Sequence, residues 1–238
     1  MSVMVPALGT ASWPNEPPGF TTITDNSFNA PDDSGWALID NTQSLATRSV
    51  DPTAPFSPPG VLEYRYPIGF PGGIGPAAEY IDLPNLRNVY VGAWWKVSNP
   101  WQGHPSNVNK VEIFFPDEGG DVYMVMYGTP GGPYELRVIP QFKNMPSDWM
   151  MPNVNHVPVT LGVWHRVEWL LMYNTSPFVA NGVIRWWLDG KLLGDYRNVR
   201  FPATPLVTYK VSAIWGGVGG IKRENDYYWY DHVHISGK

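Results

Sequence analysis

Asn88-Val-Tyr-Val-Gly-Ala-Trp-Trp-Lys-Val97 is the stretch that decides the fold class. Apolar side chains recur at every second residue, so the valines, the alanine and Trp95 share one face. The other face carries Tyr90, Gly92, Trp94 and Lys96. This period of two is typical of a β-strand with one buried side. We therefore expect Trp95 in the core and Trp94 on a mixed polar surface.

Similar strand patterns occur on both sides of this stretch. Before it we expect strands at Phe20–Thr24 and Val61–Tyr66, and after it at Val108–Phe115, Asp121–Tyr127, Tyr134–Gln141, Val163–Tyr173, Gly182–Leu188, Lys191–Tyr196, Lys210–Trp215 and Asp226–Ile235. Asp189-Gly190 is a type I′ hairpin signal between two of them. No helical period is convincing. The sequence predicts an all-β fold, a two-sheet antiparallel jelly-roll sandwich.

Length and composition agree with one domain over residues 1–238, whose residues 1–35 form a loop-rich N-terminal segment. The 238 residues include 24 glycines and 25 prolines for turns, and 12 tryptophans and 13 tyrosines for strands. The absence of cysteine excludes disulfides, thiolate metal sites and cysteine nucleophiles. A net charge of −5 without any basic run argues against a nucleic-acid partner.

The chain has no apolar stretch of the ~20 residues that a membrane span needs, so we expect no membrane insertion. Residues 1–9 have neither the basic region nor the apolar region of a signal peptide. We expect an extracellular or virion-surface location, reached after processing or by another route such as cell lysis. A homo-oligomer or a virion assembly is compatible with this expectation.

Three motifs resemble the concanavalin A-like lectin/glucanase superfamily. They are Gly162-Val-Trp-His-Arg-Val-Glu-Trp169, Asn181-Gly-Val-Ile-Arg-Trp-Trp-Leu-Asp-Gly-Lys-Leu192 and Tyr228-Trp-Tyr-Asp-His-Val-His-Ile-Ser236. The nearest resemblance is to polysaccharide-lyase and lectin-like jelly rolls, and Trp101–Lys110 is similar to a segment of uncharacterised bacterial single-domain members. Residues 85–238 carry this resemblance. It implies the fold and a glycan ligand, while the activity varies among members.

Two catalytic patterns of that superfamily are missing. Its retaining glucanases carry Glu-x-Asp-x-Glu on one strand, whereas the comparable strand here has only Glu112. Because glycoside hydrolysis needs two carboxylates, this difference argues against a glycosidase. The Gln-x-His strand motif of the alginate-lyase branch is also absent. If the protein is an enzyme, we expect a polysaccharide lyase rather than a glycosidase.

Strand parity predicts a ligand-binding set on one concave face. Aromatic rings stack on sugar rings, and charged or amide groups bind hydroxyls, uronates or sulfates. The residues of this predicted set are Tyr90, Trp94, Lys96, Lys110, Glu112, Arg137 and Gln141. The alternative is a solvated sheet surface with incidental aromatics.

Three functions stay open. The first is non-catalytic, lectin-like polysaccharide binding. The second is β-elimination in a uronic-acid polymer, with His104 or Tyr123 as base and Arg137 or Gln141 at the uronate. The third is a structural or adhesive role in a virion or at a cell surface, such as capsid decoration or a tail component.

We predict neither a cofactor nor a catalytic metal. His232 and His234 have the i, i+2 spacing of a metal pair, but the sequence offers no identifiable third ligand. We expect Asp231 to be buried and to accept hydrogen bonds from backbone or side-chain donors. A structural calcium ion stays open, because the loop carboxylates Asp32, Asp33 and Asp226 are too generic to decide it.

Overall fold

The computed structural model describes residues 13–30, 35–143 and 156–238. These residues form strands and loops and contain no helix, so none of them forms a helix that could cross a membrane. The strands are β1 (Thr21–Asn26), β2 (Trp36–Ile39), β3 (Ala46–Val50), β4 (Gly60–Tyr66), β5 (Ala78–Leu86), β6 (Asn88–Val97), β7 (Val108–Pro116), β8 (Val122–Tyr127), β9 (Glu135–Pro140), β10 (Trp164–Met172), β11 (Gly182–Leu188), β12 (Lys191–Val199), β13 (Leu206–Val211) and β14 (Asp226–Gly237).

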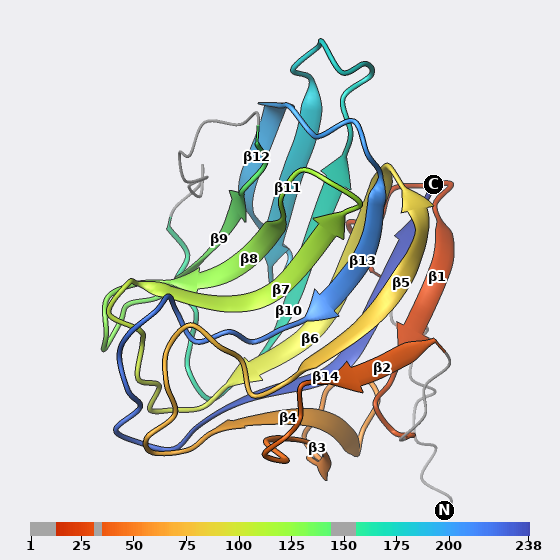
Figure 1. The fold of residues 1–238 in the computed structure, drawn as a ribbon. Coiled ribbons are helices and arrows are strands. Elements are labelled where there is room, and N and C mark those ends of the chain that lie inside the picture. Colours follow the sequence, from red (N-terminus) through yellow and green to blue (C-terminus); the bar gives the residue numbers. More distant parts are fainter. Residues whose placement is uncertain (1–12, 31–34, 144–155) are drawn as a thin grey trace, which may run out of the picture.

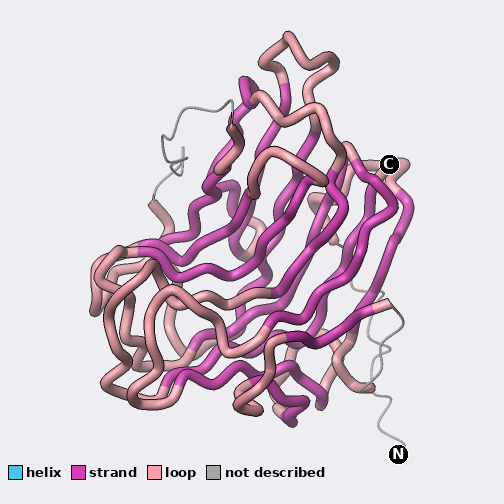
Figure 2. The backbone as a smooth tube through the Cα atoms, in the orientation of Figure 1, coloured by secondary structure: helices cyan, strands magenta, loops and turns pink. Residues whose placement is uncertain are grey.

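Two antiparallel sheets face each other (Figure 1). The eight-stranded sheet has the order β12-β11-β10-β6-β14-β4-β3, and β1 pairs with β14 beside this path. The six-stranded sheet has the order β2-β5-β13-β7-β8-β9. Loops gather at the ends of both sheets (Figure 2). The expected jelly-roll sandwich is confirmed.

The core lies between the sheets and is rich in aromatic side chains. Trp95, Trp169 and Trp186 are fully buried there. Buried tyrosine hydroxyls also connect the sheets: Tyr64 donates to the Val211 carbonyl at 2.8 Å and Tyr230 to the Val111 carbonyl at 3.0 Å. A phenol or indole can stay in an apolar core when its polar atom finds such a partner.

A β-bulge in β7 overturns part of the predicted strand parity. The register with β8 shifts between Lys110 and Glu112. An extra residue reverses the side-chain alternation beyond it. Lys110 therefore points outward as expected, whereas Glu112 and Phe114 point into the core, where Glu112 accepts a hydrogen bond from the Trp169 indole at 2.7 Å. The prediction that Glu112 lines the ligand face was wrong.

The sequence also left three strands unassigned, β2, β3 and β5, and placed β13 too late. β3 and β2 are edge strands of their sheets. They are short, and their apolar and polar residues do not alternate regularly. β5 contains Pro84, which lowers its strand signal. β13 matters for the site, because it lies between β5 and β7 in the six-stranded sheet.

Candidate glycan-binding face

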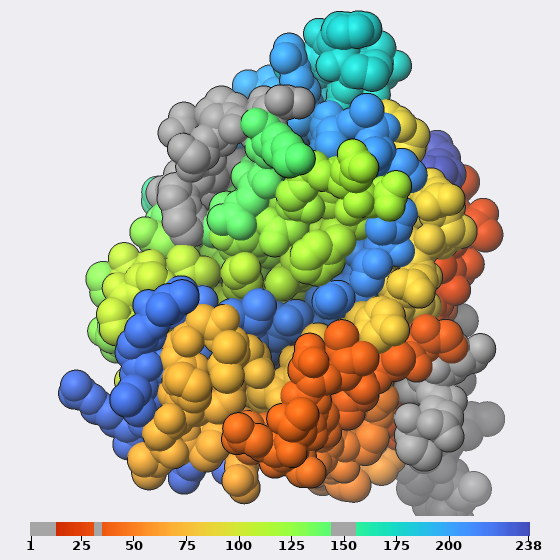
Figure 3. Space-filling view, in the orientation of Figure 1, coloured from red at the N-terminus to blue at the C-terminus, as the bar shows by residue number. Residues whose placement is uncertain are grey.

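The outer side of the six-stranded sheet carries a row of basic and aromatic side chains. We call it the basic–aromatic face; it comprises Tyr80, Lys110, Phe115, Tyr123, Tyr127, Arg137 and Lys210. Most of these residues belong to strands β5, β7, β8 and β13. Figure 3 shows the molecule from the side on which these strands lie. One cross-strand row joins Tyr123 to Lys210 through Ile113, since both residues pair with that isoleucine.

Each basic side chain of this face lies over an aromatic ring. The Lys110 ammonium is 4.1 Å from the centre of the Tyr123 ring, and the Arg137 guanidinium carbon is 3.7 Å from that of Tyr127. Lys210 lies 4.9 Å from the centre of Phe115. Cation–π contacts hold long side chains in place without neutralising their charge. The face is therefore cationic and partly ordered before any ligand arrives.

Lys110 has the most distinctive environment of the three. Burial lowers the pKa of its ammonium, and the Asp121 carboxylate opposes that shift. Within the described residues neither Lys110 nor Lys210 forms an ion pair. Burial likewise raises the pKa of Tyr123 to about 12, so this phenol stays protonated at neutral pH. A lysine with a lowered pKa can lose its proton more easily than an exposed one.

Arg137 lies at one end of the face and is already paired. Its guanidinium contacts Glu135 at 2.5 Å, and the other Glu135 oxygen is 3.0 Å from His156 Nδ1. These three residues and Tyr127 line a pocket of about 400 Å³. Glu135 thus offsets the charge of Arg137, whereas Lys110 and Lys210 form no ion pair among the described residues.

The predicted ligand set divides between the two sheets, so the prediction of one shared surface was wrong. Lys110 and Arg137 belong to the six-stranded sheet, whereas Tyr90, Trp94 and Lys96 lie on β6 in the eight-stranded sheet. Strand parity tells which residues share the side of a strand, but it does not tell which sheet the strand joins.

Trp13 covers part of that second surface. The Trp13 ring lies directly over Gly92 and packs with Tyr90, which is fully buried. Trp94 is half-buried at the margin of the same cluster. Trp95 is completely buried between the sheets, as predicted. Tyr90 is thus not an accessible sugar platform in this conformation.

Two catalytic candidates take other places. His104 is almost fully buried, and its ring nitrogens contact the Ser106 hydroxyl at 2.7 Å and the Gly219 carbonyl at 2.6 Å. With both nitrogens engaged, this histidine secures loops, and it has no free nitrogen for a base. Gln141 is exposed beyond the end of β9, where its backbone N–H bonds to the Asp121 carbonyl.

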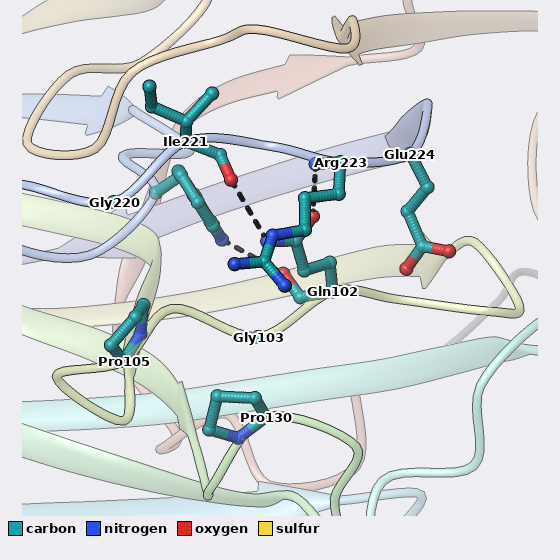
Figure 4. A pocket seen from close by; sticks show the side chains of 9 residues that line it. Gln102, Gly103, Pro105, Pro130, Gly220, Ile221, Arg223 and Glu224 are labelled. Carbon is teal, nitrogen blue, oxygen red and sulfur yellow. Dashed lines mark hydrogen bonds between the residues drawn. The ribbon is translucent and has the colours of Figure 1, made fainter.

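A second pocket, of about 450 Å³, lies among the loops near His104 (Figure 4). Gln102 forms much of its floor. The Gln102 amide donates to the Ile221 carbonyl at 3.1 Å, and its side-chain oxygen accepts the Arg223 backbone N–H. Pro105, Pro130 and Glu224 complete the walls. Its polar groups mostly bond one another, so the pocket has little free bonding capacity beyond Arg223 and Glu224.

The acidic and histidine residues considered for metals have protein partners. Asp25 bonds to both His232 and His234, at 3.1 and 2.8 Å. Asp226 is fully buried and paired with Lys222. Asp231 accepts the backbone N–H groups of Phe56 and Ser57, which agrees with its predicted structural role. Asp32 and Asp33 lie outside the described residues. In the described part of the chain, no three acidic or histidine residues form a metal-binding group.

Sequence reasoning missed four members of the face: Tyr80, Phe115, Tyr127 and Lys210. Tyr80 lies on β5, which the sequence did not predict as a strand. Tyr127 and Phe115 lie on strands that the sequence predicted. The bulge reverses the side-chain alternation before Phe115, so strand parity assigned that ring to the core. Lys210 lies in a segment predicted as a strand, and only the pairing of β13 with β7 places it beside the others.

No protein-family model matches the chain, and no curated protein sequence matches it significantly. Solved structures do share its fold. The endo-β-1,4-glucuronan lyase from the fungus Trichoderma reesei aligns with a TM-score of 0.66 at 17% identity, over 92% of this chain and 96% of that one. A variant of the alginate lyase Aly36B, in complex with an alginate trisaccharide, gives 0.64 at 13% identity, over 86% and 98%.

A third structure of the same fold is domain 4 of AbnA, an extracellular arabinanase from Geobacillus stearothermophilus, in complex with arabinotriose. Its TM-score is 0.55 at 14% identity, over 92% of this chain and 93% of that chain. At such low identities these likenesses establish the fold. The chemistry of this chain has to be argued from its own residues.

Proposed function

We propose that the protein binds an acidic polysaccharide along the basic–aromatic face. The observation that carries this proposal is the placement of Lys110, Arg137 and Lys210, each over an aromatic ring on one sheet surface. Carboxylates or sulfates of a glycan would pair with the cations, and sugar rings would pack on the exposed parts of the aromatics. Two of the solved structures that share the fold are lyases of uronate polymers, which supports this choice of ligand.

Binding of the wild-type protein to alginate and glucuronan, measured by calorimetry, tests the proposal. We expect Lys110→Ala combined with Lys210→Ala to weaken binding by about thirtyfold, the ~2 kcal/mol typical of a binding hot spot. Binding should also weaken as salt is added, since exposed charge pairs are screened. Lys191→Ala, an exposed lysine of β12, is the matched control and should bind normally. Equal binding by the double variant and the wild type would refute the proposal.

Cleavage by β-elimination is a second candidate, favoured by the lowered pKa of Lys110 and the protonated Tyr123 beside it. A neutral amine would take the proton next to the uronate carboxylate. The bond to the leaving oxygen would then break, a carbon–carbon double bond would form, and the ammonium so produced would return a proton to that oxygen.

Lys110→Arg separates the two functions, because arginine keeps the charge but stays protonated. If the protein is a lyase, this variant should bind alginate or glucuronan but form no unsaturated product, detected by ultraviolet absorbance. If the wild type forms no such product either, binding alone is the function. The virion or cell-surface role, the location and any oligomer stay predictions.

A further inference from the structure

The eight-stranded sheet carries an open pocket of about 690 Å³ on the opposite side of the sandwich from the basic–aromatic face. The end of β6, the turn before β10 and the start of β14 enclose it. Its walls include Lys96, Asn99, Val163, Asn225, Tyr227 and Trp229. The covered Trp13 cluster lies farther along the same sheet and does not line this pocket.

A single cross-strand row contributes Lys96 and Trp229 to the floor of the pocket. Trp229 pairs with Glu63 on one side and with Lys96 on the other, and Lys96 pairs in turn with Trp164. The Lys96 ammonium lies between the two indoles, 4.8 Å from the centre of the Trp229 ring and 4.6 Å from that of Trp164. The Trp229 indole donates to Glu63 at 2.8 Å. These contacts hold Trp229 in one orientation.

Tyr227 extends this ordered floor into the open pocket. Its ring stacks on Trp229, with the ring centres 5.3 Å apart and the planes 11° from parallel. Because the Trp229 ring already contacts both Lys96 and Tyr227, the Tyr227 ring is the aromatic surface that we assign to a ligand. Both rings are half-buried. A rigid aromatic surface loses little conformational freedom when a ligand stacks on it.

The charge of this pocket differs from that of the basic–aromatic face. Lys96 is paired with Asp51. Although burial opposes ionisation of the carboxyl, the hydrogen bond from Lys96 holds the pKa of Asp51 at about 2. The pair is therefore ionised and internally neutral at ordinary pH. Among the residues that line the pocket, the polar groups left to a ligand are neutral: the amides of Asn99 and Asn225 and the phenol of Tyr227. The neighbouring Glu63 carboxylate accepts the hydrogen bond of the Trp229 indole.

We propose that this pocket is a second glycan-binding site that takes neutral sugar residues, with Tyr227 as the stacking platform and the asparagine amides as partners for hydroxyl groups. An aromatic face next to uncharged hydrogen-bonding groups matches a pyranose, which has an apolar face and a rim of hydroxyls. The site does not depend on the proposed function of the other sheet, since the two share no residue.

Calorimetric titration of the full chain with cellohexaose and mannohexaose tests this site. We expect at least one of these neutral oligosaccharides to bind, and Tyr227→Ala to weaken that binding at least tenfold. Tyr227→Phe should retain most of the affinity, because it keeps the ring. Phe178→Ala is the matched control, since Phe178 is an exposed aromatic residue (88%) outside the pocket. Thermal melting of each variant verifies that it is folded.

Two results would overturn the proposal: neither oligosaccharide binds, or Tyr227→Ala binds as tightly as the wild type. The test also separates the two sites. Removing Lys110 and Lys210 should leave binding of the neutral oligosaccharide unchanged, while Tyr227→Ala should leave alginate binding unchanged. Loss of alginate binding alone would count against the basic–aromatic face and not against this pocket.

Discussion

At the scale of single residues, Glu112 shows how tertiary contacts change an ionisable group. It is fully buried between the sheets, next to the Trp169 indole. Burial raises the pKa of Glu112 to about 7, from an ordinary value of 4.5. The same residue was a candidate ligand group when judged from strand parity alone. In the folded protein it is a core residue whose protonation is linked to stability.

Glu112 should therefore make stability depend on pH. Because its pKa is higher in the folded than in the unfolded chain, the folded state binds more protons between about pH 4.5 and 7. The free energy of unfolding should fall as pH rises through this range, by up to about 1.4 kcal/mol per pH unit from this group. Urea denaturation at several pH values measures the slope.

Glu112→Gln is the control for that slope, since it keeps the shape and the oxygen acceptor but does not titrate. We expect a flatter pH dependence than in the wild type between pH 4.5 and 7. Identical pH profiles for the two proteins would show that Glu112 does not have a raised pKa.

At the scale of elements, the contact between Gly92 of strand β6 and Trp13 shows how one residue of a strand allows a loop to pack on the sheet. Gly92 lies opposite Glu168 on β10 and His234 on β14. A Cβ atom at Gly92 would be 2.2 Å from the Trp13 ring, so only glycine leaves room for that indole. Trp13 also stacks on His234, with ring centres 5.6 Å apart. A residue without a side chain thus creates the docking place for the segment.

Gly92→Ala should displace Trp13 and destabilise the protein by about 1–3 kcal/mol, as expected for overpacking. The same change in a Trp13→Ala background should be neutral or slightly stabilising, because alanine suits a strand better than glycine. A double-mutant cycle from urea denaturation measures this coupling. Additive effects of the two changes would contradict the inferred contact.

The electrostatics of the same segment depend on His234. Burial alone would lower the pKa of His234, but its hydrogen bonds and charge contacts with Asp25 and Glu16 raise it. A histidine whose pKa is raised by folding stabilises the folded state. This contribution is fully present at pH values below the pKa of the histidine in the unfolded chain, and it disappears as the pH rises through the pKa in the folded chain. Docking of the segment should be strongest in mildly acidic solution.

At the scale of the whole molecule, polar atoms in the core join the two sheets. The Tyr230 hydroxyl, which is fully buried, reaches from β14 to the Val111 carbonyl on β7. The Trp186 indole reaches from β11 to the Leu136 carbonyl on β9 at 3.1 Å. Hydrophobic packing brings the sheets together, and these directional bonds favour one alignment between them.

Tyr230→Phe should cost about 1–3 kcal/mol of unfolding free energy, because it deprives the buried Val111 carbonyl of a donor. Urea denaturation should show a lower midpoint with an unchanged slope, since the exposed surface stays the same. Tyr227→Phe, on the outer surface, is the control and should change stability by less than about 0.5 kcal/mol. Equal effects of both changes would argue against the inter-sheet bond.

The amino-acid pattern alone predicts the fold class and part of the core. Alternation in residues 88–97 places Trp95 inside, and this holds because the period of two is a property of the extended backbone. Val89, Val91, Ala93 and Val97, which share the face of Trp95, are buried as well. The motifs around Trp169 and Trp186 implied the jelly-roll sandwich through their resemblance to the concanavalin A-like superfamily.

Which side chains share a surface depends on tertiary contacts. Membership of a sheet depends on pairing between distant residues, such as Lys210 with Ile113, and no local pattern encodes it. The bulge before Glu112 and the covering of Gly92 by Trp13 also arise from long-range packing. For this reason Lys96 and Lys110, which strand parity placed in one groove, belong to different sheets. Lys96 is paired with Asp51 there, whereas Lys110 has no ion-pair partner among the described residues.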